Sequence, residues 1–302
     1  MMTGTHKSLG SIVFRVIALA LAVATVGCGR PAPRSGGKML VAASIAPMYD
    51  FSRQVGGDFV DVTMLVPPDS NPHVYQLEPG QMETLGSAAV LVLNGVQLEY
   101  WAAKAVDAAG NPKLTVVDTA KGLRIVDAGN DPDHPGGNPH VWLDPVMAVH
   151  QVEAIRDGFI KADPKHRAAY TANAARFVSK LRDLDKEIRS DFEGLKSREF
   201  VTLHPSWTYF ARRYGLVQAG VIEKSPGREP TPSEIGEVID ATKRAKVMAI
   251  FAEPQFSPKA ADVIAHETGA KVILVDAFGK PPEYSYMRTM RDNVAKIVEA
   301  LK

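Results

Sequence analysis

Two copies of one short motif carry the side chains best suited to chemistry. The motif reads Asn-Pro-His-Val followed by an aromatic residue, and it occurs at residues 71–75 and 138–142. Proline fixes its own φ and keeps the preceding residue extended, so each copy should aim its histidine, His73 or His140, from a rigid turn. Neutral imidazole is the commonest side-chain ligand of metals in proteins. One copy alone would be read as a surface turn, but the repeat predicts a metal site.

The asparagine that opens each motif has a structural interpretation. Asn71 and Asn138 are expected to cap turns with their side chains rather than to bind metal.

Three strands predicted in the second half of the chain end on further side chains that can bind a metal. His204, Glu253 and Asp276 each close a short run of aliphatic and β-branched residues. Open α/β sheets bind ligands beyond the carboxyl ends of their strands. An acid at a strand end can equally cap the next helix, but the three residues together favour a ligand-binding edge. Glu234 completes a Thr-Pro-Ser-Glu capping box and is expected to be structural.

Apolar runs alternate with amphipathic segments along most of the chain, which predicts an α/β fold with mainly parallel sheets. The predicted strands are residues 39–44, 60–66, 88–94, 114–118, 200–204, 216–221, 247–253 and 272–276. Helical spacing occurs at residues 48–55, 80–86 and 98–109. His73 then lies in the connection after the second strand.

A longer amphipathic segment, residues 164–195, separates the two halves. Its apolar residues recur in steps of three and four, the spacing of one helix face, and one helix of this length would span roughly 48 Å. We therefore expect a linking helix between an N-terminal lobe at 38–163 and a C-terminal lobe at 196–302. A coiled-coil seam with a partner chain is the alternative, but the apolar stripe is not strictly heptad, so a monomer is favoured.

Residues 1–27 have the pattern of an export signal. They contain two basic residues and no acid, followed by an apolar run at 16–26 that is too short to cross a membrane as a helix. A glycine then precedes Cys28, the only cysteine, as at the cleavage site of a bacterial lipoprotein. We expect Cys28 to be lipidated, with residues 28–37 as a tether. Ordinary cleavage nearby, with a passive Cys28, is the alternative.

Charge and cysteine content limit the function classes. The chain has 35 basic and 34 acidic residues and a net charge of +1, which argues against a nucleic-acid partner. A single cysteine provides no disulfide framework within the chain, so its core must stabilise the exported domain.

Together these motifs resemble the metal-binding solute-binding lipoproteins of bacterial ABC transporters, a zinc and manganese uptake family that also includes surface adhesins. The likeness covers nearly all of residues 39–302. Besides the two histidine motifs, it rests on Leu93-Asn94-Gly95 with Leu98-Glu99, Tyr170 and Asn173, His204 ahead of Tyr209-Phe210, Phe251-Ala252-Glu253-Pro254-Gln255-Phe256, and Asp276 with Gly279.

The resemblance implies two β/α lobes joined by a rigid helix, with one metal ion in the cleft between them. It also implies an exported protein, anchored at the periplasmic or cell-surface side, that delivers its ion to a membrane permease. The ligands of the family correspond to His73 and His140 in the first lobe and to His204 and Asp276 in the second.

The donor set favours Zn²⁺. Three imidazoles and one carboxylate can close a tetrahedral zinc site, whereas Mn²⁺ favours more oxygen ligands. His204 stands where the manganese members usually have glutamate. The long histidine-rich loop of the zinc members is replaced by residues 126–137, with His134 alone. Glu253 is expected to accept a hydrogen bond from a ligand imidazole rather than to bind the ion.

Three alternatives fit the same residues: a manganese receptor, a surface adhesin, and a zinc hydrolase with Glu253 as general base. Four protein ligands would leave no coordination position for a catalytic water, so we expect no enzyme activity. An adhesin would still bind its partner after loss of the metal ligands.

Overall fold

Two β-sheets, each of four parallel strands, organise the chain. The computed structural model describes residues 37–126, 136–224, 228–282 and 284–302. The predicted α/β class with parallel sheets is confirmed. Within these ranges no helix has both the length and the apolar character needed to cross a membrane.

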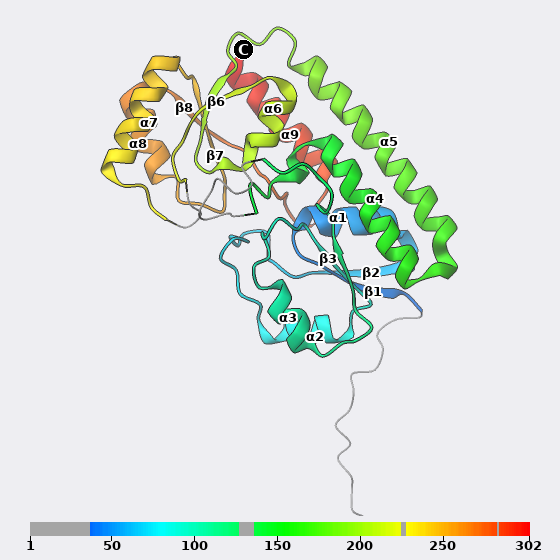
Figure 1. The fold of residues 1–302 in the computed structure, drawn as a ribbon. Helices are drawn as coiled ribbons and strands as arrows, with labels where there is room; N and C mark the ends of the chain where they lie inside the picture. The colour runs from blue at the N-terminus through cyan, green and yellow to red at the C-terminus, as the bar shows by residue number, and fades with distance from the viewer. Residues whose placement is uncertain (1–36, 127–135, 225–227, 283) are drawn as a thin grey trace, which may run out of the picture. The chain divides into compact units, whose positions relative to one another are not determined.

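The first sheet has the strand order β2-β1-β3-β4. Its strands are β1 (Met39–Ala43), β2 (Val60–Met64), β3 (Val90–Leu93) and β4 (Thr115–Asp118). Its connecting helices are α1 (Ala46–Gly56), α2 (Pro79–Ser87) and α3 (Ala102–Ala109). The almost wholly buried β1 and β3 take the centre, whereas the half-exposed β2 and β4 form the edges, as expected for aliphatic strands covered on both faces. Helix α1 covers one face, and α2 and α3 cover the other (Figure 1).

The second sheet repeats this winding with the strand order β6-β5-β7-β8. Its strands are β5 (Glu199–Thr202), β6 (Val217–Val221), β7 (Ala249–Ala252) and β8 (Lys271–Leu274). Its helices are α6 (Thr208–Tyr214), α7 (Pro232–Ala245) and α8 (Lys259–Thr268). All eight predicted strands are present, but several are shorter than predicted. His204, Glu253 and Asp276 consequently lie just beyond their strands rather than inside them.

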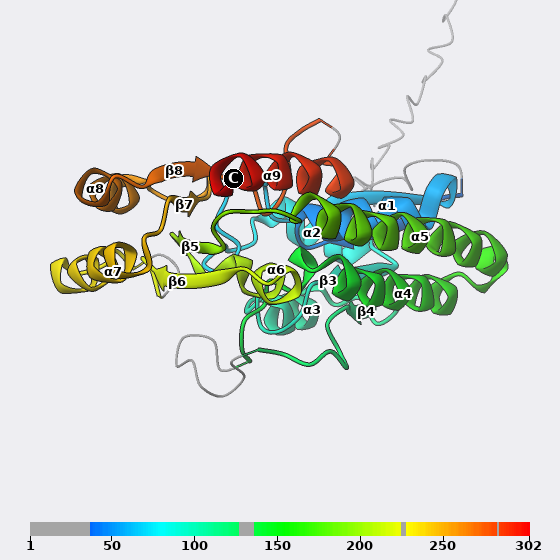
Figure 2. The ribbon, with the colours of Figure 1, turned by 90° about the horizontal axis from the view of Figure 1, so that it is seen from above.

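The connection between the sheets contains two helices, α4 (Pro145–Ala162) and α5 (Arg167–Asp191). The helix predicted at 164–195 is therefore shorter than expected. It starts after a 3₁₀ turn at Pro164–His166, because proline cannot continue α4, and it ends before Gly194, whose φ of +77° is incompatible with a right-handed helix. At 1.5 Å per residue, α5 spans roughly 37 Å. It lies along α4 in both views (Figures 1 and 2).

The last helix, α9 (Tyr286–Leu301), returns from the second sheet to the helices of the first. The backbone N–H of its Tyr286 donates to Oδ2 of Asp50 at 2.8 Å, and the Tyr286 hydroxyl donates to the carbonyl of Trp142 at 2.7 Å. The indole of Trp142 in turn donates to the carbonyl of Ala277 at 2.8 Å. One buried apolar cluster includes residues of both sheets. The two lobes are thus joined by buried contacts as well as by α5.

Candidate metal centre

Three of the four predicted ligands converge, although they are far apart in the sequence. His73 follows β2, His140 follows β4 and His204 follows β5. Their candidate ligand nitrogens all lie within 4.8 Å of one another. The His204 ring centroid lies 5.0 Å from that of His73 and 4.7 Å from that of His140. In the described part of the chain no other three His, Cys, Asp or Glu side chains gather this closely.

The separation of two of the imidazoles, those of His73 and His140, matches a tetrahedral metal site. Zinc binds imidazole nitrogen at about 2.0–2.1 Å, and a tetrahedron with that bond length separates its ligand atoms by roughly 3.3–3.4 Å. Nε2 of His73 lies 3.3 Å from Nε2 of His140. His140 is 2% exposed and His204 is 1% exposed, whereas His73 is only half-buried. Solvent therefore reaches this centre at His73.

The asparagines that precede two of the histidines cap their turns, as predicted. Asn71 accepts a hydrogen bond at Oδ1 from the backbone N–H of His73 at 3.0 Å, and Asn138 accepts one from His140 at 3.0 Å. The Asn138 Oδ1 also lies 2.8 Å from Nδ1 of the His140 ring. The sequence does not predict this ring contact, because both copies of the motif have the same residues Asn-Pro-His-Val.

The loops that follow β5 and β7 bring His204 and Glu253 together. These strands are neighbours at the centre of the second sheet, and the helices that follow them cover opposite faces, which is where open α/β sheets form a ligand crevice. Nδ1 of His204 lies 3.7 Å from Oε1 of Glu253, and the imidazole stacks on the ring of Phe256 at 4.9 Å. A separation of 3.7 Å is longer than a hydrogen bond. The orienting role of Glu253 therefore stays a prediction.

Burial disfavours the charge of Glu253. This side chain is 2% exposed, and its pKa is raised to about 8, with burial as the largest cause. The negative charge of Asp276 contributes to this rise in pKa, whereas a hydrogen bond from the Ser206 hydroxyl to Oε1, at 2.6 Å, opposes it. A cation bound nearby would favour the ionised carboxylate.

Asp276, the fourth predicted ligand, is not part of the close histidine group. It is 7% exposed and lies in the turn after β8. Its Oδ1 accepts hydrogen bonds from the backbone N–H groups of Phe278 and Gly279, at 2.9 and 3.0 Å. Asn293 on α9 binds both the N–H and the carbonyl of Asp276. This aspartate therefore shapes its own turn, and its role as a ligand stays a prediction. His134 and Cys28 lie outside the described residues.

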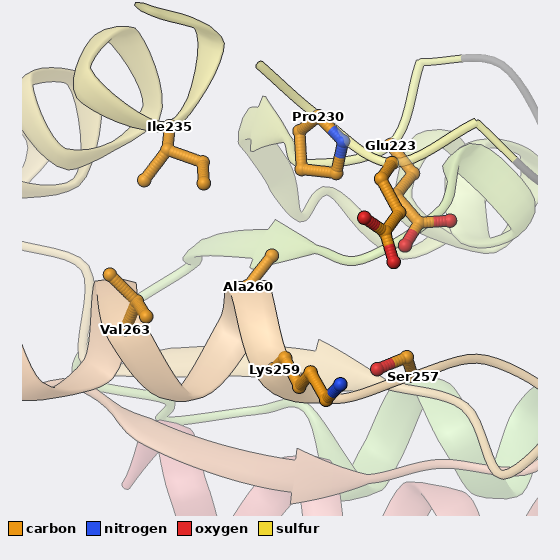
Figure 3. Close-up of a pocket in the computed structure, with 8 residues that line it drawn as sticks. Glu223, Pro230, Ile235, Ser257, Lys259, Ala260 and Val263 are labelled. Atoms are coloured by element: carbon orange, nitrogen blue, oxygen red, sulfur yellow. The ribbon is translucent and has the colours of Figure 1, made fainter. Parts of the chain in front are cut away.

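A separate cavity of about 190 Å³ lies in the second lobe. Figure 3 shows Ile235 and Val263 on its facing walls, with Glu223 and Lys259 among the polar side chains that line it. Burial, together with the charges of Glu229 and Glu253, raises the pKa of Glu223. No histidine of the described residues lines this cavity, and none of its lining residues belongs to the group formed by His73, His140 and His204.

Known proteins provide an independent comparison. Residues 41–300 match the model of the family described as ZnuA, zinc-uptake complex component A, periplasmic. The high-affinity zinc uptake system protein ZnuA of Bacillus subtilis is 29% identical, over 96% of this chain and 97% of that protein.

Solved structures share the fold. The crystal structure of a ZnuA deletion mutant with zinc bound is 33% identical, with a TM-score of 0.79 over 88% of this chain and 98% of that one. A mutant of the manganese-bound periplasmic metal-binding protein from Candidatus Liberibacter asiaticus is 26% identical, with a TM-score of 0.78 over 88% of this chain and all of that one. With the family model matching most of its length, the chain belongs to the ZnuA family of periplasmic zinc-uptake components.

Proposed function

We propose that this protein is an extracytoplasmic receptor that binds Zn²⁺ and delivers it to the permease of an ABC transporter. The observation that carries the proposal is the convergence of His73, His140 and His204, in which the nitrogens of His73 and His140 have a separation suited to tetrahedral zinc. Zinc is the cargo here, so the protein needs to bind and release it rather than use it for catalysis. The family of zinc-uptake components to which the chain belongs supports this function.

Asp276 is proposed as the fourth ligand. Its Oδ1 is engaged by its own turn, while no described residue donates a hydrogen bond to Oδ2. Its charge raises the pKa of Glu253, so the two carboxylates are close enough to interact, and Glu253 in turn lies beside His204. A carboxylate oxygen would complete a zinc site with three nitrogens and one oxygen. Glu253 is proposed to support His204 rather than to bind the ion.

The proposed setting of the protein is the outer side of a membrane. A lipid on Cys28 would anchor the chain, and a single acyl chain holds only weakly, so two or more chains are implied. The protein is proposed to act as a monomer with a permease as its partner and without nucleic acid, in keeping with a net charge of +1.

The test is elemental analysis of protein purified from its native host, followed by competitive titration with Zn²⁺ and Mn²⁺. One zinc per chain, bound more tightly than manganese, is expected. Because a structurally similar protein is manganese-bound, the second candidate is a manganese receptor, and predominant manganese in the native protein would favour it. Hydrolysis of esters, peptides or phosphates by the zinc-loaded protein would instead support an enzyme and contradict the receptor function.

A further inference from the structure

Asn138 is bonded to both lobes at once, and its amide orientation is fixed by two partners whose roles cannot be exchanged. Oδ1 accepts from the backbone N–H of His140 at 3.0 Å, and a backbone N–H can only donate. Nδ2 donates to the carbonyl of Pro205 at 2.7 Å, and a carbonyl can only accept. The oxygen of this side chain therefore faces the first lobe, and its nitrogen faces the second.

The fixed amide decides which nitrogen of His140 carries the proton. Oδ1 lies 2.8 Å from Nδ1 of the ring and cannot donate. Nδ1 must then carry the hydrogen, and in a neutral imidazole the lone pair is left on Nε2. Nε2 is also the atom that faces Nε2 of His73 at 3.3 Å. Asn138 thus presents the lone pair of His140 to the metal centre.

The other half of the same side chain binds the loop that carries the ligand of the second lobe. Pro205 directly follows His204, and Nδ2 of Asn138 also lies 3.3 Å from the hydroxyl of Thr208. The Tyr209 hydroxyl donates to the backbone carbonyl of Asn138 at 2.8 Å. Asn138 is 7% exposed, so water does not readily replace these partners.

We propose that Asn138 is a positioning residue that couples the contact between the lobes to the lone-pair direction of His140. While its amide holds both partners, zinc is retained. A small separation of the loop at Pro205 releases the amide, lets the His140 ring turn, and thereby lowers the number of aligned ligands. This inference rests on the proposed zinc receptor function and assigns the step of zinc release to one side chain.

The chain supplies a matched control in the first copy of the motif. Asn71 accepts a hydrogen bond from the N–H of His73 at 3.0 Å. In the described ranges, however, no residue of the second lobe accepts a hydrogen bond from its amide. Asn71 and Asn138 thus share the Asn-Pro-His-Val motif, the turn contact and the neighbouring ligand type. They differ in the contact between the lobes and in the contact of Oδ1 with the ligand ring, which is 2.8 Å for Asn138 and His140.

The experiment measures the dissociation rate of zinc by trapping the released ion with an excess of a chromophoric chelator, in wild type, Asn138→Ala and Asn71→Ala. Asn138→Ala should release zinc roughly 10–100-fold faster, the usual effect of losing a partner of a metal-bound imidazole, while Asn71→Ala should change the rate much less. Equal effects of the two substitutions would overturn the coupling. Thermal unfolding of the metal-free variants shows whether each one folds.

Asn138→Asp separates positioning of the ring from contact between the lobes. The carboxylate keeps an acceptor for Nδ1–H of His140, but it offers the Pro205 carbonyl an oxygen in place of an N–H. Fast release by Asn138→Asp is expected, and release at the wild-type rate would refute the coupling even if Asn138→Ala failed to fold. A wild type that binds no zinc would refute the proposed function itself, which is established before any variant is compared.

Discussion

Replacing His204 with alanine tests the centre most directly. Four-ligand zinc sites in small domains bind with apparent free energies of about 10–16 kcal/mol. Shared equally, one ligand contributes about 2.5–4 kcal/mol, which is roughly 10²–10³-fold in Kd. Water cannot readily replace the lost nitrogen, because His204 is 1% exposed and its ring stacks on Phe256. We therefore expect His204→Ala to weaken zinc binding by about two to three powers of ten.

The assay is competition for zinc with a chelator of known affinity, at one pH because the imidazoles must be neutral. His266→Ala is the control, since that side chain is 87% exposed and lies on α8 away from the converging histidines. It should bind zinc like the wild type. Wild-type affinity in His204→Ala would refute the ligand assignment and would turn attention to Glu253. A loss of zinc binding in His266→Ala would show that the assay reports something other than this centre.

Four further outcomes are expected. His204→Glu should lower the ratio of zinc to manganese affinity, because an oxygen donor replaces a nitrogen; an unchanged ratio in a two-metal competition titration would exclude His204 as a ligand. Because the pKa of Glu253 is higher in the folded protein than in the unfolded chain, the free energy of unfolding falls as the pH rises. The loss is absent below about pH 4 and complete above about pH 8. In the metal-free protein, Glu253→Gln should therefore reduce the fall in melting temperature between about pH 4 and about pH 8. Thermal unfolding followed by circular dichroism at several pH values measures this, and the same dependence of melting temperature on pH in wild type and variant would contradict it. Because α5 contains neither proline nor glycine, small-angle scattering curves of metal-free and zinc-loaded protein should nearly superpose, and a large contraction on loading would count against a stiff connector. Cys28→Ala should move the protein from the membrane to the soluble fraction, and retention at the membrane in an immunoblot would exclude lipid anchoring through Cys28.

The sequence predicted the alternation of strands and helices because that signal is local. Aliphatic runs such as those of β3 and β7 become central strands wherever both faces are covered. Helix ends were less predictable. Residues 192–195 continue the apolar stripe of α5, yet the helix stops at Asp191. The sequence patterns also predicted no helix over the segments that form α4 and α9. Helix α4 packs mainly on the next helix, α5, and on α1, which is distant in the sequence, while α9 packs on α5, β8 and α1.

What the sequence determined about the site is the donor types and the turns that aim them. A proline after asparagine restricts the backbone next to His73 and His140, so the repeated motif alone indicated paired ligands. The convergence of His204 with them was decided by the tertiary structure, since His204 belongs to a different sheet. The structure also decided that Asp276 stands outside the close group and holds its own turn.

Asn71 and Asn138 show most clearly what the sequence determines and what only the tertiary structure determines. They share the motif Asn-Pro-His-Val and make the same turn contact, but only Asn138 is bonded to the carbonyl of Pro205 on the other lobe. Turn geometry depends on a few adjacent residues, and the sequence therefore determines it. A contact between lobes depends on how α5 and α9 bring two sheets together, and only the tertiary structure decides that.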